Sequence, residues 1–395
     1  MPRNGLSSAT RAVRAGIATD GQHGAVVPPI HLSSTYRFPA FGVKGRYDYS
    51  RSGNPTRDQL AEALAALEGG ASAVVTASGM AAVTLAVQLV QPGELIVATH
   101  DCYGGTHRLL THLARRGHFE VAFVNLSDPE AVAPALARRP RLVWIETPSN
   151  PLLRITDIEG VAAAAHAVGA LVVADNTFLS PALQQPIALG ADIVVHSTTK
   201  YINGHSDVVG GAVIAAHQGL GEELAWWANC LGLTGAPFDA FLTLRGVRTL
   251  HARMRIHEEN ALAIAAALAA HPLVEAVHYP GLVDHPGHTL AKRQQQGFGA
   301  MLSFAVHGGA PAVEAVATGL ELFTLAESLG GVESLIAHPA TMTHAAMELA
   351  ARAAAGIGDG LLRLSVGIEH GTDLVADLLG TLDRVAATAL VQGAV

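Results

Sequence analysis

The sequence predicts an α/β protein with a mostly parallel, doubly wound sheet, followed by a smaller α+β domain. Between residues 73 and 195, short apolar runs rich in valine and isoleucine alternate with helical segments of roughly 10 to 13 residues. This alternation stops at about residue 245. Because 395 residues exceed one ordinary hydrophobic core, we expect an N-terminal arm over 1–56, a large domain over 57–245 and a C-terminal domain over 246–395.

The N-terminal arm lacks sustained periodicity and is rich in glycine, proline and serine. A segment of this length without a core of its own has to lie against the body of its subunit or against a neighbouring subunit. From Thr56 an amphipathic pattern predicts a helix that ends at about Glu68, before Gly69 and Gly70.

The predicted elements then follow in order. In the large domain, strands are expected over 73–76, 95–98, 121–124, 142–145, 171–174 and 193–195. Helices are expected between them over 79–89, 105–115, 129–138 and 158–168. In the C-terminal domain, helices are expected over 249–270 and near 313–319, and strands over 274–279, 299–306 and 361–366.

Composition excludes several classes of function. The net charge of −8 and the lack of basic runs argue against nucleic acid or an anionic membrane as a partner. No apolar run reaches the length of a membrane span, and the first 20 residues lack the apolar core of a secretory signal. Cys102 and Cys230 are too few for a disulfide framework, so we expect a reducing compartment, the cytoplasm.

Two charged residues follow predicted strands of the large domain. Asp175 comes directly after one strand, and Lys200 follows another, next to the hydroxyl residues Ser197 and Thr199. Open α/β sheets bind ligands at the carboxyl ends of their strands. This donor set suits pyridoxal 5'-phosphate, with Lys200 bonding the cofactor's aldehyde carbon, Asp175 facing the pyridine nitrogen and the hydroxyls binding phosphate. The sequence therefore predicts an enzyme that depends on pyridoxal phosphate.

Other motif interpretations lack support. Ser197 and Lys200 also match the S-x-x-K pattern of penicillin-binding proteins and class A β-lactamases, but the accompanying K-T-G and S-D-N tripeptides do not occur. No G-x-G-x-x-G or P-loop pattern occurs. The pair His285 and His288 lies in a Pro-Gly turn, and neither H-E-x-x-H nor C-x-x-C exists, so we expect no metal site.

The segment Ser78-Gly79-Met80 follows the first strand of the large domain and opens a helix. Free N–H groups and the helix dipole make such a helix start a cradle for phosphate. A plain N-cap serine would look the same in isolation. The hydroxyls of Ser197 and Thr199 at the same sheet edge favour the phosphate interpretation.

Two further residues fit an enzyme that acts on amino acids. Tyr103 follows another strand and precedes Gly104 and Gly105, so its ring is expected to stack on the pyridine ring, with the glycines allowing close approach. Arg363 lies inside an apolar strand, and a buried guanidinium needs an anion. A substrate α-carboxylate held by two hydrogen bonds is the expected anion, and a buried ion pair is the alternative.

These motifs, ordered along nearly the whole chain, resemble the Cys/Met metabolism family of pyridoxal-phosphate enzymes. The segments that carry the resemblance are 47–56, 78–80, 103–106, 146–151, 175–178, 196–201 and 327–334.

The resemblance implies a fold-type I enzyme that forms a homotetramer of two active dimers and acts on small amino-acid substrates. It implies that Tyr49 and Arg51 bind the phosphate of the neighbouring subunit, which would give the arm its purpose. Within the subunit it implies cofactor-binding roles for Ser78, Gly79, Met80, Tyr103, Asp175, Thr177, Ser197, Thr199 and Lys200. It implies substrate-binding roles for Asp48, Arg108, Asn150, Glu327, Ser328 and Arg363, and catalytic roles for Lys200 and Tyr103.

Within the family, the segment 225–239 is most similar to bacterial members in which L-cysteine replaces the acyl group of O-succinyl-L-homoserine to give L-cystathionine, in methionine biosynthesis. Gly105 stands where the methionine-cleaving members carry a reactive cysteine. Arg108 is expected to receive the distal carboxylate of a succinyl ester. Ser52, however, replaces a second arginine found in some succinyl-using members, so the acyl group stays open.

Three alternatives remain for the activity. One is γ-elimination of cystathionine to cysteine, 2-oxobutyrate and ammonia, which uses the same residues. Another is the sulfhydrylation of an acyl-homoserine. The third is a cofactor-free binding scaffold, and the intact set of Lys200, Asp175 and Arg363 argues against it.

Overall fold

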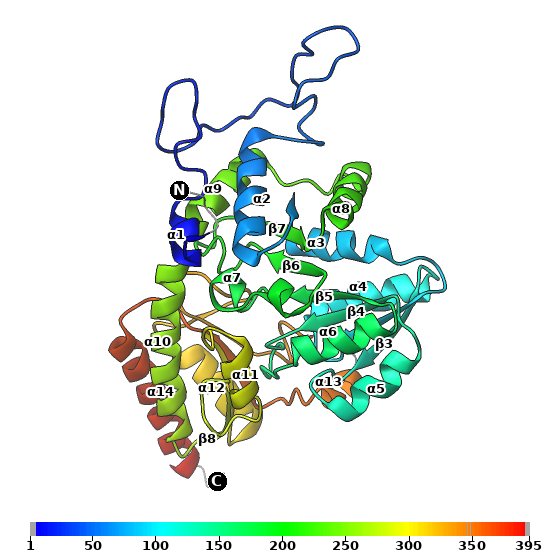
Figure 1. Cartoon of the computed structure of the whole chain (residues 1–395). Helices are drawn as coiled ribbons and strands as arrows, with labels where there is room; N and C mark the ends of the chain where they lie inside the picture. The colour runs from blue at the N-terminus through cyan, green and yellow to red at the C-terminus, as the bar shows by residue number, and fades with distance from the viewer. Residues whose placement is uncertain (1–4, 346, 348, 392–395) are drawn as a thin grey trace.

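Two β-sheets organise the chain in the computed structural model, which describes residues 5–345, 347 and 349–391 (Figure 1). The larger sheet has seven strands in the order β1 (Ser72–Thr76), β7 (Gly211–Ala215), β6 (Ile193–Ser197), β5 (Leu171–Asp175), β4 (Leu142–Glu146), β2 (Leu95–Thr99) and β3 (Glu120–Val124). Strand β7 runs antiparallel to both of its neighbours, and the other pairs are parallel. The prediction of a mostly parallel sheet is confirmed.

Helices cover both faces of this sheet. One face packs against α3 (Gly79–Ala86), α4 (Gly104–Arg115) and α8 (Gln218–Leu231). The opposite face packs against α2 (Pro55–Glu68), α5 (Pro129–Ala137), α6 (Ile158–Ala167) and α9 (Pro237–Val247). Successive residues of one strand therefore belong to different cores: on β6, Val195 faces α3, whereas Val194 faces α2. This doubly wound arrangement also matches the prediction.

Local sequence signals explain where the helices begin and end. The side chain of Asn54 accepts hydrogen bonds from the N–H groups of Thr56 and Arg57, and Pro55 occupies the first turn of α2. The helix ends at Gly69, whose φ of 77° is left-handed. Ser78 caps α3 in the same way, because its side chain accepts from the N–H of Ala81.

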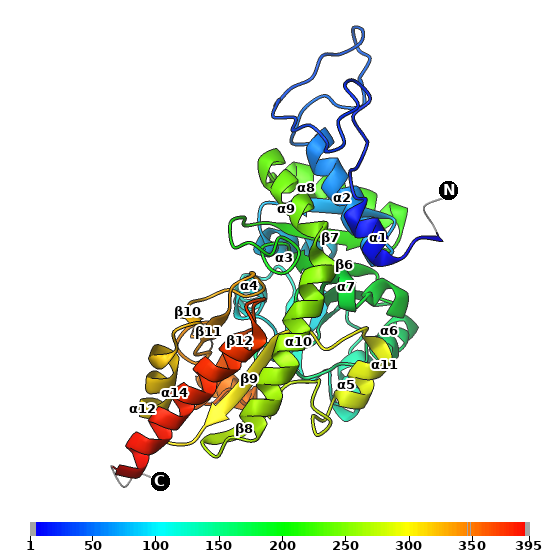
Figure 2. The same ribbon diagram turned by 90° about the vertical axis from the view of Figure 1, so that its left-hand side faces the viewer.

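The C-terminal part is built on a five-stranded sheet in the order β10 (Thr324–Leu325), β11 (Leu335–Ala337), β12 (Leu361–Ser365), β9 (Met301–Val306) and β8 (Val274–His278). Helices α10 (Leu250–Ala269), α12 (Gly309–Gly319) and α14 (Gly371–Val391) pack into one core with it (Figure 2). The remaining elements are α1 (Ser8–Val13), η2 (Val87–Leu89), α7 (Ser180–Leu183), η3 (Pro186–Leu189), α11 (His288–Gln294) and α13 (Leu349–Ala354).

The part of the N-terminal arm between α1 and α2 projects from the body in both views (Figures 1 and 2), whereas α1 packs on the body. Between residues 19 and 53 it forms no helix, and its ladder pairing is limited to the isolated bridges Thr35–Tyr49 and Ala40–Val43. Leu32 and Phe41 are largely exposed on it. Across the described residues, no helix combines the length and apolar character that a membrane crossing needs.

Candidate active site

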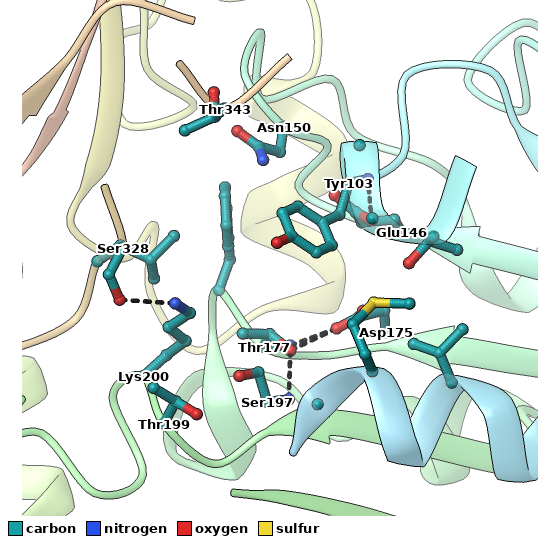
Figure 3. A pocket seen from close by; sticks show the side chains of 18 of the residues that line it. Tyr103, Glu146, Asn150, Asp175, Thr177, Ser197, Thr199, Lys200, Ser328 and Thr343 are labelled. Atoms are coloured by element: carbon teal, nitrogen blue, oxygen red, sulfur yellow. Dashed lines mark hydrogen bonds between the residues drawn. The ribbon is translucent and has the colours of Figure 1, made fainter. Parts of the chain in front are cut away.

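A cavity of about 510 Å³ opens at the carboxyl ends of the parallel strands, between the large sheet and the C-terminal part. The cofactor-site residues predicted from the subunit itself line it: Ser78, Gly79, Met80, Tyr103, Asp175, Thr177, Ser197, Thr199 and Lys200. The predicted substrate-site residues that line it are Arg108, Asn150, Glu327, Ser328 and Arg363. Residues far apart in the sequence therefore meet in one place (Figure 3).

Lys200 follows β6 and extends into this cavity (Figure 3). Its Nζ donates a hydrogen bond of 2.6 Å to Oγ of Ser328. Burial, with a smaller contribution from the positive charge of Arg363, lowers the pKa of Lys200 to about 8, and Glu327 acts in the opposite direction. A lysine with this pKa supplies a neutral, nucleophilic amine near neutral pH.

Asp175 ends β5 and is held by Thr177. The hydroxyl of Thr177 donates to Oδ1 of Asp175 at 2.5 Å, and the Thr177 N–H donates to the same oxygen at 3.0 Å. The N–H of Ser197 donates to that hydroxyl at 3.0 Å, so Thr177 joins the ends of β5 and β6 (Figure 3). Burial raises the pKa of Asp175, while the bonds from Thr177 and the charge of His196 lower it.

The start of α3 approaches β6 closely enough to form a cradle. A Cβ atom on Gly79 would lie 2.7 Å from Cβ of Ser197, so only glycine permits this approach. Thr199 is fixed by Gly210, since its hydroxyl accepts from the Gly210 N–H at 3.0 Å and donates to the Gly210 carbonyl at 3.2 Å. Helix N–H groups and hydroxyls thus converge as an anion site requires.

The ring of Tyr103 lies in the cavity, at the start of α4 (Figure 3). A Cβ on Gly105 would lie 2.5 Å from this ring, so glycine leaves room for it. The N–H of Tyr103 donates to Oε2 of Glu146 at 2.8 Å. Glu146 ends β4 beside Asp175, and burial together with the Asp175 charge raises its pKa well above the usual range. The sequence analysis missed Glu146, although its position at a strand end, like that of Asp175, was the available signal.

Arg363 lies on β12 and is almost fully buried at the cavity. Its Nη1 donates to Oδ1 of Asn150 at 3.0 Å, and its Nη2 donates to the carbonyl of Ser328 at 3.0 Å. Among the described residues it forms no salt bridge, and its Nε is buried without a hydrogen-bond partner. Burial lowers its pKa to about 10. A buried, charged guanidinium without a carboxylate partner is prepared for an anionic ligand.

Three predicted residues lie outside the cavity of their own subunit. Tyr49 is half exposed on the arm, and Arg51 stacks over its ring while donating to the carbonyl of Asn229 at 2.7 Å. Asp48 accepts hydrogen bonds from Lys44 and Ser52, and these bonds lower its pKa to about 2. Within one chain the structure therefore does not bring these three residues to the site.

The residues present fit pyridoxal phosphate. The glycine-dependent cradle at α3 suits its phosphate, the carboxylate of Asp175 suits its pyridine nitrogen, and the amine of Lys200 suits its aldehyde. In the described part of the chain, no group of three or more histidine, cysteine, aspartate or glutamate residues is placed to hold a metal ion. The fold and the site together define an enzyme that uses pyridoxal phosphate.

Comparison with known proteins agrees. Residues 9–383 match the model of the Cys/Met metabolism PLP-dependent enzymes. Cystathionine gamma-synthase of Escherichia coli (strain K12) is 58% identical over 94% of this chain and 96% of its own length. Cystathionine gamma-lyase of Dictyostelium discoideum is 47% identical over 96% of this chain and 99% of its own length. The crystal structure of cystathionine gamma synthase from Xanthomonas oryzae pv. oryzae in complex with cystathionine has a TM-score of 0.96 and 63% identity, covering 97% of this chain and 99% of that one. The chain belongs to the Cys/Met metabolism family of PLP-dependent enzymes.

Proposed function

We propose that this enzyme catalyses γ-replacement, in which L-cysteine displaces the acyl group of O-succinyl-L-homoserine, or of another O-acyl-homoserine, to give L-cystathionine. The observation that carries the proposal is the similarity to synthases of this reaction, at 58% and 63% identity, above the 47% to a γ-lyase. The buried guanidinium of Arg363 supports a substrate with an α-carboxylate.

Bound pyridoxal phosphate would supply an electron sink that stabilises negative charge at the substrate's α-carbon. Lys200 is the proposed base that removes the α-proton and then moves a β-proton, since its lowered pKa provides the neutral amine. In this proposal Asp175 would face the ring nitrogen, and residues 78–80 with Ser197 and Thr199 would hold the phosphate. Tyr103 is the proposed group that accepts a proton from the incoming ammonium.

We assign substrate recognition to the part of the cavity that is lined by Arg108, Asn150, Glu327, Ser328 and Arg363. Arg363 and Asn150 bind the α-carboxylate, with Ser328 orienting Lys200. We assign the distal carboxylate of the succinyl group to Arg108 and the amino group of the incoming cysteine to Glu327, and both residues line the cavity. These roles follow from the chemistry of the side chains that line the cavity.

A γ-lyase is the second candidate, because a relative with that activity is 47% identical over 96% of the chain. One assay separates the two. Purified enzyme is given O-succinyl-L-homoserine plus L-cysteine, and in parallel L-cystathionine alone. We expect rapid formation of cystathionine in the first reaction and little 2-oxobutyrate in the second. Rapid 2-oxobutyrate release with negligible condensation would reverse the assignment, and condensation with sulfide in place of cysteine would identify a homoserine sulfhydrylase.

We further propose that the enzyme works as a homotetramer of two active dimers in the cytoplasm. In this assembly the arm, 1–56, crosses to the neighbouring subunit, where Asp48, Tyr49 and Arg51 complete the site of the large domain, 57–245, and the C-terminal domain, 246–395. The apolar side chains of Leu32 and Phe41 on the arm are largely exposed within one chain, which supports the proposal that a neighbouring subunit covers them. Light scattering at micromolar concentration tests it, since a monomer would contradict the proposal.

A further inference from the structure

A carboxylate and a histidine lie fully buried behind the large sheet, on the face opposite the cavity. Glu68 is the last residue of α2, and His196 lies on β6 between Val195 and Ser197. Both flanking residues line the cavity, and His196 therefore points to the other face. The ring Nε2 of His196 lies 2.5 Å from Oε1 of Glu68.

The same carboxylate oxygen also binds the end of the neighbouring strand. Oε1 of Glu68 accepts a hydrogen bond of 2.8 Å from Nδ2 of Asn176, which directly follows Asp175. Thr177 ties the ends of β5 and β6 together on the cavity side, and Glu68 ties the same two ends together from behind. Two separate connections thus hold the segment that presents Asp175.

This pair is not explained by stability alone. Glu68 lies at the carboxyl end of α2, where the helix dipole is negative and disfavours a further negative charge. Its Oε2 and the Nδ1 of His196 are both buried without a hydrogen-bond partner among the described residues. Apolar side chains of the same volume generally serve stability as well as a buried ion pair does. Buried polar atoms that lack a partner in a native structure call for an explanation.

The neighbouring strand, β5, ends at Asp175, the residue that this pair holds in place. A carboxyl group buried at a helix end needs hydrogen-bond partners, and in the described part of the chain Oε1 of Glu68 has His196 and Asn176 as side-chain partners. The charge of His196 in turn lowers the pKa of Asp175, against the effect of burial. Glu68 is therefore linked through Asn176 to the residue beside Asp175, and through His196 to the strand that pairs with β5.

We propose that Glu68 and His196 are positioning residues that hold the end of β5, and with it the carboxylate of Asp175, in place from the opposite face of the sheet. They touch neither substrate nor cofactor. The inference rests on the role proposed above for Asp175 as the partner of the cofactor's ring nitrogen.

The test compares two ligands that differ in one atom. Apoenzyme is titrated with pyridoxal phosphate and with its analogue in which the ring nitrogen is replaced by carbon, and the quenching of tryptophan fluorescence gives both dissociation constants. The ratio of the two constants reports the interaction with the ring nitrogen. The variants are Glu68→Gln, which keeps a hydrogen-bond acceptor but removes the charge, and His196→Gln.

Three further variants provide the comparisons. Asp175→Asn removes the charge directly. Tyr279→Phe removes one buried hydrogen bond, from the hydroxyl to the Gly299 carbonyl at 2.8 Å, in the core of the C-terminal part. The double variant Glu68→Leu with His196→Leu replaces the pair by apolar groups, which keeps the test open if single variants fold poorly. Thermal unfolding is recorded for every variant.

We expect wild-type enzyme and Tyr279→Phe to prefer pyridoxal phosphate by about tenfold or more. In both Gln variants and in the double variant, the preference falls at least about threefold and kcat falls about tenfold, with KM and affinity for the analogue within about twofold. The inference would be overturned if the Gln variants and the double variant lost affinity for both ligands equally, or kept the full preference. The role of Asp175 would still stand in that case, provided that Asp175→Asn loses the preference. If Asp175→Asn keeps the full preference, the role of Asp175 itself is wrong and the inference is overturned with it.

Discussion

Nζ of Lys200 lies 2.6 Å from Oγ of Ser328, across the boundary between the two halves of the molecule. Lys200 follows β6 of the large sheet, whereas Ser328 precedes β11 and carries a left-handed φ of 84°. The backbone of Ser328 also accepts from Arg363, so one residue orients both the amine and the guanidinium of the site.

Lys200→Ala should abolish turnover without unfolding the protein, because the other residues that line the cavity remain to bind the cofactor without a covalent bond. We expect kcat to fall by about 10³-fold or more, within the range that a general base contributes. Borohydride reduction followed by peptide mapping should label position 200 in the wild type and nothing in the variant. Lys292→Ala, at an exposed position of α11, is the matched control and should behave as the wild type.

Lys200 should also make apoenzyme stability depend on pH. Its pKa is about 8 in the folded chain against 10.5 for an ordinary lysine, so the unfolded chain binds the proton more tightly. The charged amine therefore destabilises the fold fully below pH 8, and this penalty disappears as the pH rises towards 10.5, by roughly 3 kcal/mol. Urea unfolding of apoenzyme and Lys200→Met at pH 7, 9 and 10.5 should show the stability advantage of the variant shrinking. A constant difference would contradict the assigned burial of the amine.

Arg363→Met should raise KM for the acyl-homoserine by about 100-fold, since two charge-assisted hydrogen bonds of about 1.5 kcal/mol each are lost. Arg363→Lys should recover only part of this loss, because an ammonium cannot form the two parallel bonds of a guanidinium. Arg255→Met, on the exposed side of α10, removes an arginine elsewhere and should leave KM unchanged. Steady-state kinetics measure KM for each variant. An unchanged KM for Arg363→Met would exclude Arg363 as the group that binds the substrate's α-carboxylate.

Gly79→Ala should weaken cofactor binding by about tenfold, because the new Cβ at 2.7 Å from Ser197 forces α3 away from β6. The matched control is Gly219→Ala near the start of α8, where a Cβ would meet nothing within 4 Å. Equilibrium dialysis of the two apoenzymes should show a loss for the first alone. Equal affinities would show that the approach of α3 to Ser197 does not form the phosphate cradle.

Mixing inactive variants should test the shared site. If Arg51 serves the neighbouring subunit, a hybrid of Arg51→Ala and Lys200→Ala subunits contains one intact site, and random mixing should recover about a quarter of wild-type activity. Arg363→Met mixed with Lys200→Ala is the control, because both residues line the cavity of one chain and no intact site can form. Absence of rescue in the first mixture would place Arg51 outside the neighbouring site.

The repeat of apolar runs predicts six of the seven strands of the large sheet, because strands buried on both faces are apolar at every position. The seventh, β7, is missing from the prediction. Its sequence, Gly211–Ala215, is short and rich in small residues, and its place between β1 and β6 depends on pairing with segments far away in the chain. Helices α8 and α9, which pack on the large sheet, and α14, which packs in the C-terminal core, were also not predicted.

The strand-end rule identifies Asp175 and Lys200 because a parallel sheet collects its ligands at one edge. The rule does not identify Glu68, because Glu68 is 128 positions from His196 and contacts it on the face of the sheet opposite the cavity. The rule also does not predict in which subunit's site a residue acts. Arg51 therefore belongs to the sequence motif, although it lies outside the cavity of its own subunit.

The antiparallel strand β7 has a consequence for how the enzyme is made. β1, the first strand to leave the ribosome, pairs with no strand other than β7 among the described elements, and it leads directly into the Ser78 turn. A nascent chain that ends at Lys200 already carries the predicted cofactor-binding residues of its own subunit, although Ser328 and Arg363 are still to be made. It still lacks the strand that docks this turn beside Ser197, so the vitamin-binding pocket closes only after synthesis has passed residue 215.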